Sequence, residues 1–182
     1  VSRCRNSLAA TGTKATMTLA KPSERIHSSE PIRLVAGTTV VMFARAGDRW
    51  EHEVWVADGR VWLSIEGPAD QQSDPRWPAS PPLVEVSLAA TSNGAAILGV
   101  GRAGRSHYSL AIAACPGTAD TLLFDVACRI HELPHWLGSS YQLAGAAVPA
   151  RLQACLSASL PTTIRWSYTV GPGGIQARPV AG

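Results

Sequence analysis

The sequence predicts an all-β fold, an antiparallel sandwich or barrel of about eight short strands built from hairpins and meanders. The first observation is a series of short runs in which apolar and polar residues alternate, the period of a half-buried strand. The second is that Gly, Asn and Asp residues separate these runs at close intervals. The third is that 46% of the 182 residues are hydrophobic and 16% are charged, which suffices for one core. We therefore expect one β domain over 31–170, between a flexible N-terminal segment, 1–30, and a flexible C-terminal tail, 171–182.

The first three strands are expected to form a meander. A β-branched and apolar run covers 38–45, and a Gly47-Asp48 turn leads to a second run, 49–57. The Asp58-Gly59 pair then separates this run from a third, 60–66. Asp-Gly between two apolar runs is the strongest short signal for a hairpin, because both turn residues need positive φ.

The Asp58-Gly59 turn also predicts the register of its hairpin. A two-residue loop places Trp55 opposite Trp62 and Val54 opposite Leu63. One face is then suited to the core and comprises His52, Val54, Val56, Val61, Leu63 and Ile65. The other face is mostly polar and comprises Glu51, Glu53, Trp55, Arg60, Trp62, Ser64 and Glu66, with Val40 and Met42 of the preceding strand beside the tryptophans.

The predicted Trp55/Trp62 pair is the best candidate binding site in the sequence. Exposed tryptophans on a sheet face form a flat platform for a sugar ring or an extended peptide. The alternative is that the pair is covered by the Pro-rich loop 67–82, by the N-terminal segment or by another subunit. The last case predicts a homo-oligomer through the Trp55/Trp62 face.

Five further strands are expected after the Pro-rich loop. They cover 83–90, 95–100, 107–114, 121–130 and 163–170, and turns at 92–94 and 116–117 separate the inner ones. The pattern of 141–160 is ambiguous, and one short helix is the interpretation we adopt for it.

A literal G-x-G-x-x-G occupies 99–104, with glycines at Gly99, Gly101 and Gly104. The stretch resembles NAD-dependent oxidoreductases of the glucose–fructose oxidoreductase type. This resemblance implies a helix over 105–115 and a role for Asp125 at the ribose hydroxyls. The alternation over 107–114 favours a strand instead, so an NAD(P)-dependent oxidoreductase fragment is an alternative and no cofactor is the preferred expectation.

A literal H-E-x-x-H follows at 131–135, and with the next three residues it resembles the metzincin peptidases. The resemblance implies zinc ligands at His131 and His135 and a Glu132 side chain that polarises the metal-bound water. Pro134 lies inside the helix that the motif requires, at a cost of about 3 kcal/mol or more. Tyr141 occupies the position of the third ligand. A zinc metallopeptidase is therefore a second alternative, and no metal is the preferred expectation.

Four stretches together resemble an uncharacterised bacterial family of small β-rich proteins. They are Trp77-Pro-Ala-Ser-Pro-Pro-Leu83, Gly104-Arg-Ser-His-Tyr108, Phe124-Asp-Val-Ala-Cys-Arg129 and Leu137-Gly-Ser-Ser-Tyr141. The resemblance implies a β-rich fold and bacterial origin, and no particular activity.

Charge and cysteine content limit the partners. The net charge of +3 is small and scattered, which argues against a nucleic-acid partner, and no apolar stretch is long enough for a membrane span. Four isolated cysteines without a secretory signal predict free thiols and a cytoplasmic location. Arg102, Arg105 and His107 are close enough in the sequence to bind an anion.

The preferred interpretation is a soluble, non-catalytic β-sandwich binding or interaction module, and not an enzyme. Its partner is an unknown small molecule, glycan or protein. The candidate ligand-binding residues are Trp55, Trp62, Arg102, Arg105 and His107.

Overall fold

The computed structural model describes residues 30–67, 74–156 and 159–179, which form twelve β-strands and no helix. The strands are β1 (Ile32–Ala36), β2 (Thr39–Ala46), β3 (Arg49–Trp55), β4 (Val61–Ser64), β5 (Leu83–Thr91), β6 (Gly94–Ala103), β7 (Ser106–Ala114), β8 (Leu122–Ile130), β9 (Gly138–Leu143), β10 (Ala150–Gln153), β11 (Thr162–Gly171) and β12 (Gly174–Arg178). The all-β prediction is confirmed, although the strands are more numerous than the sequence analysis expects.

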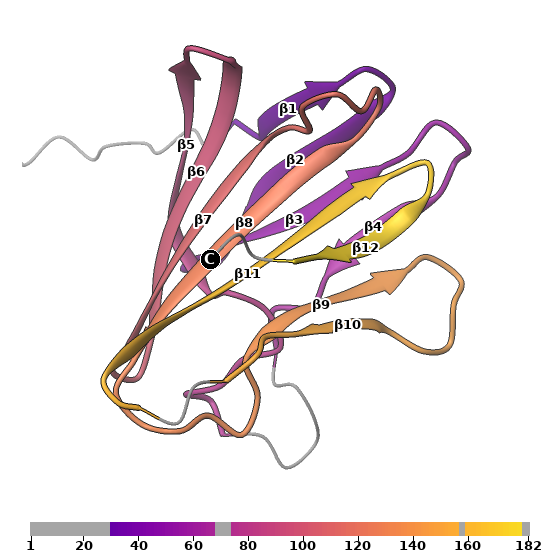
Figure 1. Cartoon of the computed structure of the whole chain (residues 1–182). Helices are drawn as coiled ribbons and strands as arrows, with labels where there is room; N and C mark the ends of the chain where they lie inside the picture. The colour runs from indigo at the N-terminus through magenta and orange to yellow at the C-terminus, as the bar shows by residue number, and fades with distance from the viewer. Residues whose placement is uncertain (1–29, 68–73, 157–158, 180–182) are drawn as a thin grey trace, which may run out of the picture.

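The strands belong to one antiparallel sheet in two halves, joined where Trp50 of β3 pairs with Leu83 of β5. The first half has the order β1-β2-β3-β4-β9-β10, and the second has the order β5-β6-β7-β8-β11-β12. The sheet curls into a nearly closed, barrel-like structure (Figure 1). β1 approaches β5, β6 and β7 of the second half. Apolar side chains from both halves meet inside and form the core.

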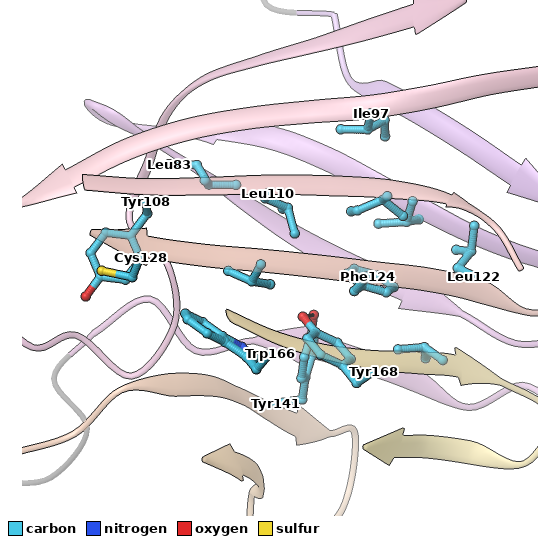
Figure 2. Close-up of a cluster of buried hydrophobic side chains, with 14 of the residues drawn as sticks. Leu83, Ile97, Tyr108, Leu110, Leu122, Phe124, Cys128, Tyr141, Trp166 and Tyr168 are labelled. Carbon is cyan, nitrogen blue, oxygen red and sulfur yellow. Dashed lines mark hydrogen bonds between the residues drawn. The ribbon is translucent and has the colours of Figure 1, made fainter. Parts of the chain in front are cut away.

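Strict alternation determines which residues of the second half reach the core. On β7 and β8 every second residue is buried, in the pattern that the sequence predicts. Leu110, Phe124 and Tyr168 come from three neighbouring strands and point to the same side of the sheet (Figure 2). The rings of Phe124 and Tyr168 are stacked with centroids 4.9 Å apart. Burial of each such side chain contributes about 1.5–3 kcal/mol to stability.

The second part of β6 turns two glycines toward the interior and two large apolar side chains toward solvent, whereas Ile97 is buried in the core. Gly99 and Gly101 alternate with Leu98 and Val100 along this strand. A Cβ at Gly101 would lie 1.9 Å from the carbonyl oxygen of Pro82, so only glycine fits. Because the chain entering β5 occupies the inner side, Leu98 and Val100 lie on the outer face, 45% and 48% exposed.

Two expectations about the later part of the chain are wrong. Residues 141–160 contain no described helix, and β9 and β10 run through this stretch as a hairpin. The tail predicted at 171–182 contains β12, which pairs with β11 from Ser167↔Arg178 to Gly171↔Gly174. Nearly all of the N-terminal segment, residues 1–29, and residues 180–182 lie outside the described residues.

The register predicted for the Asp58-Gly59 hairpin is wrong by one residue. Trp55 pairs with Val61, and Val54 pairs with Trp62. Since the side chain alternates between faces, this shift exchanges the inward and outward positions of β4. Trp62 turns toward the interior while Trp55 stays outside, so the predicted tryptophan pair does not form.

The loop length explains the shift. The amide of Gly59 donates to the carbonyl of Val56, and the amide of Val56 donates to the carbonyl of Arg60. The loop therefore has three residues, a turn followed by a left-handed residue, with Gly59 at φ 84°. Asp-Gly fits the last two positions of this loop as well as it fits a two-residue turn.

Candidate functional site

The outer face of the second half carries a shallow groove of about 660 Å³, a volume typical of small-molecule sites. The strand register places outward residues in rows across β6, β7, β8 and β11. The rows are Arg102–His107–Arg129–Thr163, Val100–Ser109–Ala127–Arg165 and Leu98–Ala111–Asp125–Ser167. The second and third rows line this outer groove, and the first row borders it.

Side-chain size explains the shape of the outer groove. Small side chains form its floor on β7 and β8, namely Ser109, Ala111 and Ala127. Larger side chains form its walls, with Leu98 and Val100 on β6 and Arg165, Arg178 and Pro179 on the opposite side. One wall is therefore apolar and the other is cationic.

The structure brings together the residues that the sequence suggested for an anion. Arg102 and His107 are direct cross-strand neighbours. Arg105 lies in the turn between their two strands. All three are exposed, and neither arginine has a hydrogen bond or ion pair with another described residue.

Sequence reasoning missed two further arginines, because their place depends on the register of β8 and β11. Arg129 lies opposite His107, and its Nη1 is 3.5 Å from the Thr163 hydroxyl. Arg165 lies diagonally across from Arg129 and makes no hydrogen bond or ion pair within the described part of the chain. The one carboxylate in the groove, Asp125, accepts a 2.6 Å hydrogen bond from a serine hydroxyl of β11.

A second surface lies on the outer face of the first half. Val35, Val40, Trp55 and Val61 are cross-strand neighbours in one row over β1 to β4. Trp55 is 47% exposed, and Val35 is equally open to solvent. Of the predicted neighbours of Trp55, Val40 therefore lies directly opposite it. We call this surface the Trp55 row.

Trp62 belongs to the inner face and not to the Trp55 row. It is partly buried, packs against the core, and has a buried indole Nε1–H without a hydrogen-bond partner among the described residues. Its separation from Trp55 removes the two-ring platform that the sequence suggested.

The glycine motif lies in β6 and in the turn that follows it. Gly99 and Gly101 face the interior, and Gly104 adopts φ 55° in the turn to β7. The helix required for pyrophosphate binding is replaced by β7 (Ser106–Ala114). Asp125 lies on the outer face of β8. The motif is therefore explained by close packing and a hairpin turn.

The H-E-x-x-H residues lie in the loop after β8. His131 and His135 are exposed, Pro134 is buried, and none of them is helical. Both oxygens of Glu132 accept hydrogen bonds from Arg76 Nη1 at 2.9 Å. Nowhere in the three described ranges do three or more His, Cys, Asp or Glu side chains gather as metal ligands do. The zinc interpretation thus lacks the helix on which it depends.

A polar cluster lies inside the sheet. His52 Nε2 and the Tyr141 hydroxyl are 2.8 Å apart. The hydroxyls of Tyr141 and Tyr168, whose side chains Figure 2 shows facing one another, are also 2.8 Å apart. Glu66 accepts a 2.6 Å hydrogen bond from Ser64, and its Oε1 is 3.9 Å from His52 Nδ1. The sequence analysis placed Glu66 on an outer, polar face, so the cluster was not foreseen.

Burial determines the protonation of this cluster. Desolvation lowers the pKa of His52 to about 3 and raises the pKa of Glu66 to about 7. It also raises the pKa of Tyr141 and of Tyr168. The enclosed space beside these groups has no room for a water molecule. The cluster therefore links buried side chains of the core by hydrogen bonds, and a substrate cannot reach it.

No family model matches the chain, and neither does any curated protein or solved structure with which it was compared. The resemblance to a bacterial family of small β-rich proteins thus stays a prediction. The described residues contain no helix that could cross a membrane. Cys115, Cys128 and Cys155 are free thiols, and burial raises the pKa of Cys128 to about 12.

Proposed function

We propose that this protein is a non-catalytic binding module whose ligand lies in the outer groove. The observation that carries the proposal is the exposure of Leu98 and Val100 on one wall of the groove, opposite an arginine, Arg165, that lacks a partner in the described chain. Each apolar Å² covered by a ligand would contribute roughly 25 cal/mol. A contiguous apolar surface rimmed by polar groups is typical of a ligand site.

The placement of titratable groups supports binding over catalysis. The carboxyl and imidazole with strongly shifted pKa values, Glu66 and His52, are enclosed in the core. The carboxylate that lines the groove, Asp125, accepts a hydrogen bond from the hydroxyl of Ser167. His107 lies in the row that borders the groove. The ligand class is a small molecule, a short glycan or a protein segment. Free thiols favour a reducing compartment such as the cytoplasm.

The test is to block the groove with a large side chain on its floor. Ala127→Trp places an indole between the two walls, while Ala44→Trp adds the same ring to an exposed position on β2. Compounds, glycans and peptides that raise the melting temperature of the wild type are selected by thermal shift. We expect them to lose their effect on Ala127→Trp and to keep it on Ala44→Trp. Compounds that stabilise all three proteins equally would contradict the proposal.

The Trp55 row supports a second candidate, a homo-oligomer interface. A dimer would cover four neighbouring apolar residues that are otherwise in contact with water. Sedimentation velocity of the wild type and of Trp55→Arg measures this directly. We expect a dimer in the wild type and a monomer in the variant. A monomeric wild type at high micromolar concentration would contradict the interface.

A further inference from the structure

We infer that the ligand of the outer groove is a small amphipathic anion, with an apolar body on the β6 wall and an acidic headgroup among the arginines of β8 and β11. This inference rests on the proposed function and adds the chemistry of the ligand. It follows from the asymmetry of the two walls.

The apolar wall fits the body of such a ligand. Leu98 and Val100 stand two residues apart on β6 and face the groove. The floor between them and β11 consists of Ser109, Ala111 and Ala127, with Asp125 at one end, and both alanines are half-buried. A flat apolar body can therefore reach the backbone of β7 and β8 and cover both large side chains.

The cationic side fits the headgroup. Arg165 forms part of the groove wall, and Arg129 lies diagonally across from it, about 7–8 Å away between Cα atoms. Arg102 and His107 continue the border row. Guanidinium groups bind carboxylates, phosphates and sulfonates through paired N–H donors. Four positions on one face thus offer donors, and neither Arg102 nor Arg165 has a partner among the described residues.

The carboxylates of this face set the direction of the ligand. Asp125 lies in the third row, and Glu85 lies opposite Val100 on the outer face of β5. Both repel an anion from the β5 side and from the far end of the groove. The headgroup is therefore expected between Arg165 and the border row, two residues along each strand from Asp125, about 7 Å away.

The experiment compares two fluorescent probes that share one apolar ring system and differ in a single sulfonate group. They are 1-anilinonaphthalene-8-sulfonate, which is an amphipathic anion, and N-phenyl-1-naphthylamine, which is its neutral counterpart. We expect the anion to bind about tenfold more tightly, as for one charge-assisted hydrogen bond. Arg165→Gln should remove this preference, and Asp125→Asn should increase it. Arg33→Gln, an exposed arginine beside the Trp55 row, is the matched control and should change nothing.

The outcomes separate the inference from the proposed function. Equal affinity of the two probes, with both lost in Ala127→Trp, would overturn the anionic headgroup and leave the groove as the binding site. Binding of both probes that survives Ala127→Trp would overturn both proposals. Anion binding that falls in Arg33→Gln and not in Arg165→Gln would place the site on the Trp55 row and also overturn the inference.

Discussion

Replacement of Glu66 by glutamine is expected to make the protein more stable above neutral pH. The Glu66 side chain is 9% exposed, and its Oε1 accepts a hydrogen bond from Ser64. Its Oε2 is buried and has no hydrogen-bond partner in the described part of the chain. An ionised carboxylate is costly in this position, so burial raises its pKa to about 7. Glutamine has nearly the same shape and does not ionise.

The magnitude follows from the pKa of the carboxyl in the two states. A rise from 4.5 to about 7 corresponds to about 3 kcal/mol of stability. Between these pH values the unfolded chain has released the proton while the folded chain still holds it. The contribution of the Glu66 carboxyl to the free energy of unfolding is therefore fully present below pH 4.5 and is lost as the pH rises through 7. The Glu66→Gln variant does not lose stability in this way, because glutamine does not ionise.

Urea unfolding of the wild type and of Glu66→Gln at pH 4 and pH 8 provides the assay. We expect the stability of the variant relative to the wild type to increase by about 3 kcal/mol between the two pH values. Glu30→Gln removes an exposed carboxylate and controls for the change in net charge. A difference between Glu66→Gln and wild type that is the same at both pH values would refute the argument.

Two further predictions follow from the interior. Because the pKa of His52 is lowered to about 3, stability should be lost as the pH falls from 6.5 toward 3, which opposes the trend of Glu66. The wild type should therefore show a plateau between about pH 4.5 and 6.5 in urea unfolding, and a steady slope there would contradict the two opposed pKa shifts. Gly101→Ala should destabilise the protein by about 3 kcal/mol or more, since its Cβ would meet the Pro82 carbonyl. Gly67→Ala, whose Cβ meets no atom of the described residues within 4 Å, should be close to neutral, and equal effects of the two changes would contradict this explanation.

The strands that the sequence predicted are those that alternate over many residues. β7 and β8 each place every second residue in the core, so their pattern is unambiguous. β9, by contrast, begins with Gly138, Ser139 and Ser140, which are all buried and have no apolar alternation. Ser140 is buried because its amide and carbonyl both hydrogen-bond the Ser80 hydroxyl of the Pro-rich loop. Such a strand depends on contacts with neighbouring segments, and its own sequence has no alternating pattern that would predict it.

The prediction of a Trp55/Trp62 pair was wrong for a different reason, which is the length of a single loop. Asp58-Gly59 fits two loop lengths, and sequence does not distinguish them. One extra loop residue sends Trp62 inward and replaces it beside Trp55 by Val61. The anion candidates Arg102 and His107 were predictable because one tight turn joins their strands. Arg129 was not, since its place depends on a second hairpin with a longer loop.

The outer groove combines a packing constraint with a surface property. Only glycine fits at Gly101, because the chain enters β5 against that side of β6. The alternation of β6 then places Leu98 and Val100 on the outer face, where both are exposed, while Ile97 shares the inner face with Gly99 and Gly101. A polar residue at either position would satisfy the same backbone and would cost nothing in the core. The apolar wall is therefore not required by the fold, which is why we assign it to the ligand.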